Sequence, residues 1–180
     1  MCKPAGAVAT WLHSRLTSRV PHTSSFEERG VRRTPAGVEA TINESRMYVG
    51  IDVVSVNEVA SSLERFGERY IGRIFTPREA AYCRSASGRV AAERFAARFA
   101  AKEATFKALR PEASSMDWRS IEVRRHASGW CDVVLHGEAA ALAARQGIET
   151  LALSMSHDAG CATAVVVAQV ARTSTSNPEP

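Results

Sequence analysis

The feature that most constrains this chain is a stretch of about 20 residues with the pattern of one long helix. It covers about 89–109 and ends before Pro111. At about 100° per residue, Phe95, Phe99 and Phe106 fall within about 40° of one another, which predicts one buried stripe. Other elements must cover that stripe, so we expect the rest of the fold to be built around this helix.

Short segments rich in β-branched residues lie on both sides of the helix and predict strands. The first is Tyr48–Val54, and the others are expected at 120–125, 131–135, 150–156 and 162–170. A turn at Ser128-Gly129 would join the second and third strands. The predicted fold class is therefore α+β, with an antiparallel sheet packed against a long central helix.

Three shorter helices are also expected. Ser55 or Asn57 could cap a helix that continues to about Phe66. The segment Thr76-Pro77-Arg78-Glu79 places a capping residue, a proline and an acid in the order typical of a helix start. The last of these helices covers 137–146 and ends at Gly147, a residue favoured beyond helix C-termini.

The regular patterns occupy one unit in the middle of the chain, a domain at 47–171. Residues 1–46 contain three prolines and show no sustained period, which is typical of disorder or of an extension mis-called upstream of a start at Met47. Residues 172–180 are expected to be a flexible tail.

The formal net charge of +4 argues only weakly for a nucleic-acid partner, because residues 1–46 contribute +3 of it. The four cysteines are scattered without a C-x-x-C pair, which disfavours a zinc site or a disulfide framework. No apolar run approaches the roughly 20 residues that span a bilayer, and no signal peptide is recognised. We therefore expect a cytoplasmic protein that binds neither nucleic acid nor membrane.

Several polar residues could carry chemistry. Glu103 and Lys107 are four residues apart on the long helix, so they share a face and could serve a metal ion and a phosphate. An ordinary surface ion pair is the alternative. Asp52 interrupts a β-branched strand after Gly50, and it either meets a cation or faces solvent at the strand end.

His157 follows Ser156 at the end of a predicted strand and could bind a phosphate, or it could be an ordinary loop histidine. Ser156, His157 and Asp158 are consecutive, and a catalytic triad requires residues that converge in space, usually from separate segments. We therefore do not interpret them as a triad.

Taken in order, these motifs resemble the holo-acyl-carrier-protein synthase type of 4′-phosphopantetheinyl transferase. The matching segments are Gly50-Ile51-Asp52-Val53-Val54, Arg98-Phe99-Ala100-Ala101-Lys102-Glu103-Ala104, Lys107-Ala108-Leu109, Trp118 with Ile121-Glu122-Val123, and Leu153-Ser154-Met155-Ser156-His157. The resemblance covers about 47–170, and the segment from Phe99 to Ala104 with its following lysine is its most specific part.

The resemblance implies a fold, an activity and a set of site residues. Asp52 and Glu103 match the family's two Mg²⁺ ligands, and Lys107 matches the lysine near the coenzyme A phosphates; these three are the expected catalytic residues. Lys107, Arg98 and His157 match residues that bind coenzyme A, the last two at its nucleotide portion. The expected partner is an apo acyl carrier protein or related carrier domain, and the expected assembly is a homotrimer with sites between subunits.

In the implied reaction, a serine hydroxyl of the carrier protein attacks the β-phosphate of coenzyme A, and 3′,5′-ADP leaves. Mg²⁺ prefers few carboxylates together with waters and phosphate oxygens, which suits two acids and a pyrophosphate. Glu103, or a water that it holds, is the candidate for taking the serine proton.

The chain departs from the family pattern in two places. Glu58 falls where relatives commonly have an arginine that meets the acidic helix of the carrier protein, and Ser55 replaces a usual acid. Docking could then use Arg65, Arg69 or Arg73. The segment 110–115 replaces a glycine-rich turn that lines the coenzyme A site. A special carrier protein of a secondary pathway would fit these differences.

Two alternatives stay open at this point. The chain could carry out another Mg²⁺-dependent phosphoryl transfer or hydrolysis on a nucleotide, keeping Asp52 and Glu103 without a carrier protein. It could also be a non-catalytic module that binds carrier proteins or coenzyme A.

Overall fold

The computed structural model describes residues 46–111 and 116–171. The elements in chain order are β1 (Met47–Ser55), α2 (Val56–Ile74), α3 (Pro77–Arg84), α4 (Gly88–Leu109), the 3₁₀ turn η1 (Trp118–Ser120), β2 (Ile121–Arg125), β3 (Cys131–Leu135), α5 (Gly137–Arg145), β4 (Ile148–Asp158) and β5 (Cys161–Val170). The expectations for 1–45 and 172–180 lie outside the described residues.

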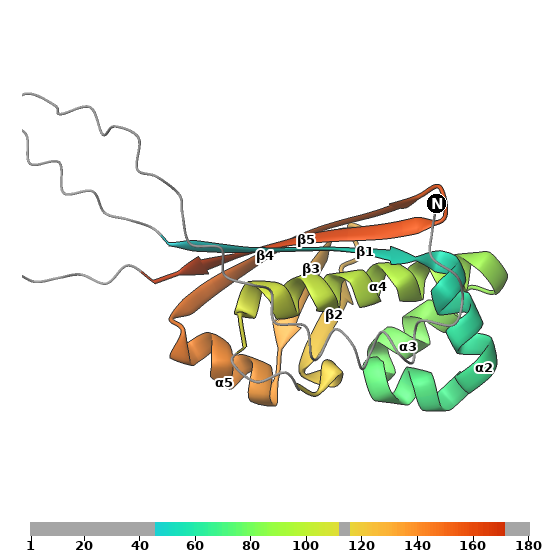
Figure 1. Ribbon diagram of the computed structural model, residues 1–180, viewed down its shortest axis with the longest axis horizontal. Coiled ribbons are helices and arrows are strands. Elements are labelled where there is room, and N and C mark those ends of the chain that lie inside the picture. The colour runs from blue at the N-terminus through green and yellow to red at the C-terminus, as the bar shows by residue number, and fades with distance from the viewer. Residues whose placement is uncertain (1–45, 112–115, 172–180) are drawn as a thin grey trace, which may run out of the picture.

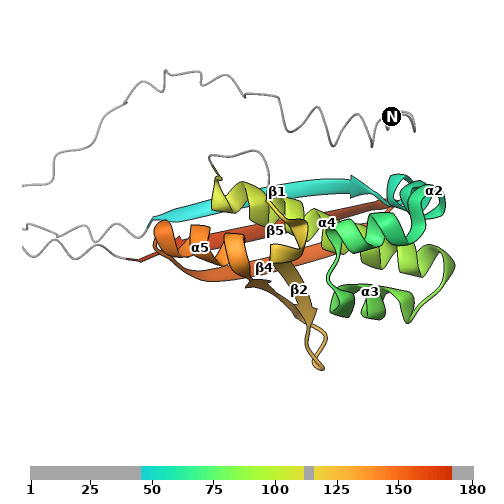
Figure 2. The same ribbon diagram turned by 90° about the horizontal axis from the view of Figure 1, so that it is seen from below.

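The predicted α+β class is confirmed, and α4 is the central helix. Strands β1, β5 and β4 form an antiparallel sheet in that order, and α4 lies along one face of it (Figure 1). The strands nevertheless form two separate sheets instead of the expected single one. Strands β2 and β3 pair only with each other, and Figure 2 shows their hairpin extending away from the three-stranded sheet.

Helix α2 is longer than the sequence predicts. Ser55 caps its start by accepting a hydrogen bond from the backbone N–H of Glu58, as expected. The predicted end near Phe66 coincides with a break in the helix: Gly67 leaves the helical conformation, with φ 49° and ψ −127°, and a second helical segment then continues to Ile74. Such a backbone conformation is open to glycine and strained for other residues, so Gly67 permits the kink between the two segments.

Helix α3 begins as its sequence predicts. The Thr76 side chain accepts from the backbone N–H of Glu79, and the Glu79 carboxylate accepts from the backbone N–H of Thr76 at 2.8 Å, which completes a capping box. Glu79 is fully buried, so this cap forms inside the protein.

The core lies between α4 and the inner face of the sheet, with α2 and α3 covering the end where β1 finishes (Figure 1). Phe95 and Phe99 are buried there, whereas Phe106 is only half-buried and packs with a second cluster beside α5. The predicted aromatic stripe therefore spans two clusters, which Trp118 joins by packing against both Phe99 and Phe106.

Candidate active site

Close packing of β1 on α4 sets the geometry of the site. A Cβ atom at Gly50 would lie 1.9 Å from the carbonyl oxygen of Ala104 and 2.8 Å from the backbone nitrogen of Ala108, so only glycine fits. Nearer the helix end, the guanidinium of Arg110 lies over the ring of Tyr48, 4.2 Å from its centroid.

These contacts show that β1 and α4 run in opposite directions. Arg110 meets Tyr48, and Ala104 and Ala108 meet Gly50, each step along the strand matching a step back along the helix. Two strand residues cover about 6.6 Å and four helix residues about 6 Å. The same spacing brings Asp52 level with the helix turn that carries Glu103.

Asp52 and Lys107 are in direct contact. Lys107 Nζ donates to Asp52 Oδ1 at 2.7 Å and to the carbonyl oxygen of Ile51 at 2.8 Å. The Asp52 side chain is 3% exposed and that of Lys107 is 37% exposed. On the neighbouring strand, the Thr163 hydroxyl donates to the carbonyl oxygen of Asp52 at 3.1 Å, which fixes the strand backbone here. Asp52 is thus a buried carboxylate beside a partly exposed ammonium, not an aspartate facing solvent.

Glu103 is buried one helical turn before Lys107. Because Glu103 is buried, it does not form an ordinary surface ion pair with Lys107, which was the alternative for this spacing. Burial raises the pKa of the half-buried Tyr70 hydroxyl above its usual range, and the charge of Glu103 raises it further. Tyr70 consequently stays protonated near the carboxylate. Sequence reasoning missed Tyr70, because it lies beyond the predicted end of α2.

Arg98 lies on α4 but is not in the Asp52–Lys107 contact. Its side chain is buried with the guanidinium over the ring of Tyr82, 4.1 Å from the centroid, and it donates to the carbonyl oxygen of Arg94 at 3.3 Å. Its Nε atom is buried without a hydrogen-bond partner. Tyr82 was not foreseen, since no spacing in the sequence links it to α4.

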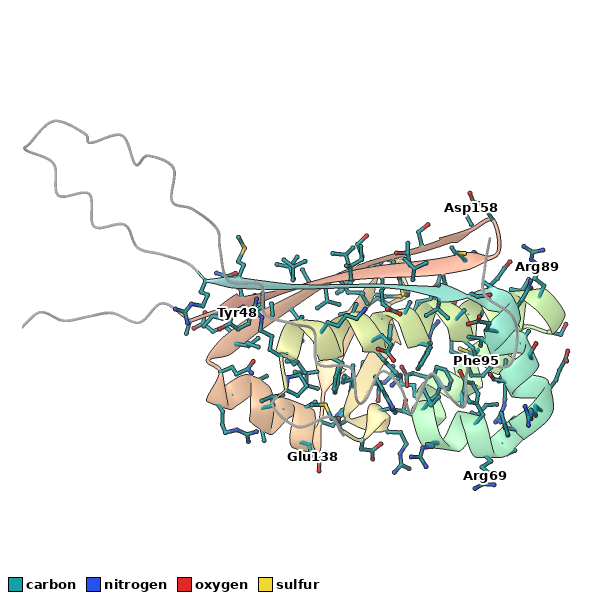
Figure 3. The ribbon with its side chains drawn as sticks, in the orientation of Figure 1. Tyr48, Arg69, Arg89, Phe95, Glu138 and Asp158 are labelled. Carbon is teal, nitrogen blue, oxygen red and sulfur yellow. The ribbon has the colours of Figure 1, made fainter. Side chains whose placement is uncertain are left out.

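His157 lies at the end of β4, two strands away from β1. In the sheet register, Ala162 of β5 stands between His157 and Val54. The half-exposed His157 side chain instead approaches α4, where Nδ1 is 4.0 Å from Glu93 Oε2. Within one chain, His157 is therefore not part of the Asp52–Lys107 contact. Figure 3 shows Tyr48 and Asp158 at opposite ends of the sheet.

Ser55 and Glu58, which depart from the family pattern near β1, have local structural roles. Ser55 is the N-cap of α2, and Glu58 lies in the first turn, where a negative charge favours the helix. Of the segment 110–115, Arg110 adopts the left-handed conformation with φ 46°, which usually favours glycine, and 112–115 lie outside the described residues.

Two acids alone do not make a complete metal site. In the part of the chain that the structure describes, no group of three or more His, Cys, Asp or Glu side chains could hold a metal ion. Two carboxylates can still hold Mg²⁺ when substrate phosphates and waters supply the other oxygens. The same described residues include no helix long and apolar enough to cross a membrane.

The profile of the 4′-phosphopantetheinyl transferase superfamily, ACPS, matches residues 48–165. A holo-[acyl-carrier-protein] synthase of Koribacter versatilis is 45% identical over 119 residues, which are 66% of this chain and 94% of the relative. One of Desulforudis audaxviator is 45% identical over 120 residues, 67% of this chain and 90% of the relative. The chain belongs to this family.

Solved structures of the same family share the fold. The Chronobacterium ammoniagenes ACPS–CoA complex is 34% identical with a TM-score of 0.62, covering 71% of this chain and 99% of that one. A Bacillus anthracis holo-(acyl-carrier-protein) synthase in complex with CoA (3′,5′-ADP) is 28% identical with a TM-score of 0.57, covering 69% and 96%. The resemblance of the motifs is confirmed, and the chain is an enzyme of the 4′-phosphopantetheinyl transferase class.

Proposed function

We propose that this chain transfers the 4′-phosphopantetheine group of coenzyme A to a serine of an apo acyl carrier protein or a related carrier domain, in a Mg²⁺-dependent reaction that releases 3′,5′-ADP. The observation that carries the proposal is the contact of buried Asp52 with Lys107, one turn after buried Glu103. The proposal is supported by the presence of these three charged residues on β1 and α4, two of them in direct contact.

Asp52 and Glu103 would hold the Mg²⁺ ion between β1 and α4. Their chemistry fits, because Mg²⁺ binds hard oxygen ligands and usually takes one or two carboxylates together with substrate phosphates. When bound, the ion supplies charge neutralisation on the pyrophosphate. Both acids are buried on packed elements, so they are positioned before the substrate arrives.

Lys107 would act on the phosphates directly. Its ammonium is more exposed than the carboxylate that it binds, so it can contact an anionic substrate while keeping one bond to Asp52. Positive charge at this point favours the negative charge that grows as the leaving group departs. Glu103, or a water held by its carboxylate, would take the proton from the carrier serine.

The nucleotide portion of coenzyme A would extend toward Arg98 and His157. Arg98 supports this assignment with a buried, unpartnered Nε beside the aromatic ring of Tyr82. His157 is two strands away from the Asp52–Lys107 contact, which suits a role in the site of a neighbouring subunit.

A homotrimer would also bury the outer face of β1. Four apolar side chains alternate with the site residues of this strand and are 57–62% exposed: Met47, Val49, Ile51 and Val53. No described element covers this face (Figure 1). An exposed apolar row on a sheet favours association, and a partner subunit of the same kind is the expected cover.

The carrier protein would dock on α2. Arg65, Arg69 and Arg73 are exposed and four residues apart, and Figure 3 shows Arg69 pointing away from the protein body. Exposed arginines on both sides of the Gly67 kink can complement an acidic helix, and their effect should fall with added salt. We also propose a cytoplasmic location, which the free thiols of Cys83, Cys131 and Cys161 support.

A transfer assay separates this proposal from its alternatives. The purified chain is incubated with Mg²⁺, coenzyme A and an apo carrier protein, and the mass of the carrier is measured. Addition of phosphopantetheine with release of 3′,5′-ADP supports the proposal. Coenzyme A hydrolysis without carrier modification favours a nucleotide hydrolase, and tight binding without product favours a non-catalytic module.

A further inference from the structure

Lys102 on α4 makes a buried contact that has no part in the reaction proposed above. The side chains of Lys102 and Glu79 are both 0% exposed, and Lys102 Nζ lies 2.9 Å from Glu79 Oε2. The ammonium also donates to the carbonyl oxygens of Trp118, at 2.9 Å, and Ile121. Its three donors thus reach acceptors on α3, η1 and β2.

Glu79 is also fully engaged. Its Oε1 accepts from the backbone N–H of Val123 at 2.9 Å, and its Oε2 accepts from the backbone N–H of Thr76 at 2.8 Å. We call Lys102, Glu79 and these backbone partners the Lys102–Glu79 node. The node ties α4 to the start of α3 and to β2, and its opposite charges cancel inside the core.

Much of the remaining buried surface of α4 is formed by small side chains that pack against the sheet. Phe95, Phe99 and Leu109 are its large buried apolar side chains, and half of its buried residues are alanines: Ala92, Ala96, Ala97, Ala100, Ala101, Ala104 and Ala108. The sheet opposite presents Gly50 and small residues of β5: Ala162, Ala164 and Ala168. Small residues allow close approach but form shallow ridges, so the directed bonds of the Lys102–Glu79 node add control over the position of the helix.

We propose that Lys102 is a positioning residue for the transferase reaction, fixing the rotation and axial position of α4 through the Lys102–Glu79 node. This inference rests on the proposed function. Glu103 is the next residue and Lys107 lies further along the same helix, so any rotation of α4 moves both relative to Asp52. A misplacement of about 1 Å can lower a rate about 100-fold.

An effect of the Lys102–Glu79 node on the geometry of the site can be distinguished from an effect on the stability of the fold. A buried ion pair often adds little net stability compared with apolar residues of similar size, whereas its directed bonds select one arrangement. If the node positions the site, removing it should change the kinetic and metal-binding properties of molecules that remain folded. If it only stabilises the fold, the folded molecules should behave like the wild type.

The test compares Lys102→Met and the charge-neutral double variant Lys102→Met/Glu79→Gln with the wild type. The matched control is Leu142→Ala, which weakens the second core cluster, on α5 and away from β1. For each folded protein, kcat is measured at saturating substrates. Mn²⁺ binding is measured by electron paramagnetic resonance with coenzyme A and no carrier protein, so that no turnover is needed.

We expect both node variants to lose about 100-fold in kcat and about 10-fold in Mn²⁺ affinity, and Leu142→Ala to keep wild-type values in its folded fraction. Wild-type kcat and Mn²⁺ affinity in a folded node variant would overturn the positioning role. Failure of both node variants to fold would also overturn it, since the node would then serve the fold itself. Absence of transfer by the wild type would instead refute the proposed function.

Discussion

Helix α4 carries two lysines that each contact a carboxylate, and the two contacts differ in burial. Lys102 and Glu79 are both fully buried, and the ammonium has further acceptors in two backbone carbonyls. Lys107 is 37% exposed beside Asp52 at the margin of the core. The buried pair can only hold protein segments together. In the second pair, Lys107 can replace a contact with the protein by a contact with the substrate. Burial thus separates a structural use of lysine from a chemical one on one helix.

Lys102→Met should produce the largest loss of stability. It leaves the Glu79 carboxylate buried without its ammonium, and removing one partner of a buried pair costs about 3–5 kcal/mol. Urea unfolding followed by circular dichroism measures the change. A loss below about 1 kcal/mol would show that the buried pair is no more important to the fold than an exposed one.

Gly50→Ala should disturb the site through the backbone. The added Cβ would meet the Ala104 carbonyl at 1.9 Å, so β1 and α4 must move apart. We expect about 3 kcal/mol of destabilisation, because overpacking costs of this kind reach that size. Gly72→Ala is a suitable control, since nothing lies within 4 Å of a Cβ there. Equal unfolding midpoints for the two variants would contradict the close packing of β1 on α4.

Lys107→Met should lose rate with little loss of stability, whereas Lys102→Met should lose both. Turnover should fall about 100-fold, the size seen when one preorganised electrostatic contact to a developing charge is removed. Stability should fall less than in Lys102→Met, because Lys107 is 37% exposed and water can reach its position to hydrate the Asp52 carboxylate. Rates and unfolding midpoints measured on one preparation test both statements. A variant that loses stability and keeps its rate would reverse the assignment of the two lysines.

The Cys83 thiol, near Glu79 of the buried pair, should also make the stability of the fold depend on alkaline pH. Burial raises the pKa of the Cys83 thiol to about 11; Arg98 opposes this rise, and the charge of Glu79 adds to it. Between pH 9 and about 11, the unfolded chain loses this proton while the folded chain keeps it. The stability contribution of the neutral thiol is therefore complete below pH 9 and falls by about 2–3 kcal/mol as pH rises toward 11.

Comparing Cys83→Ala with the wild type isolates this contribution, since Tyr70 and Lys102 titrate in both proteins. The difference in unfolding free energy between the two should shrink as pH rises from 9 to 11. A difference that stays constant over this range would show that the thiol titrates alike in the folded and unfolded chains.

The strands, the long helix and the capping box could be predicted from local pattern, because β-branched runs, the apolar period and Thr76-Pro77-Arg78-Glu79 are local signals. Motif order also predicted the family. The contact of Asp52 with Lys107 could only be suspected, since the two residues are distant in the chain and meet through the packing at Gly50.

Other features could not be predicted from the sequence. Lys102 looks like a solvent-facing residue by its type, yet Glu79 allows its full burial. The second helical segment of α2, beyond the kink at Gly67, was not predicted, so the influence of Glu103 on Tyr70 was missed. The separation of β2 and β3 into their own sheet depends on which strands pair, and strand pattern alone leaves that open.

A crystal structure with coenzyme A and Mn²⁺ would show directly whether Asp52 and Glu103 share one metal ion, because anomalous scattering locates the ion. One ion is expected, with carboxylate oxygens of both Asp52 and Glu103 at about 2.0–2.1 Å, the remaining ligands being phosphate oxygens and waters. An ion bound to the phosphates without either carboxylate, or carboxylates too far apart to share it, would contradict the assignment of the site.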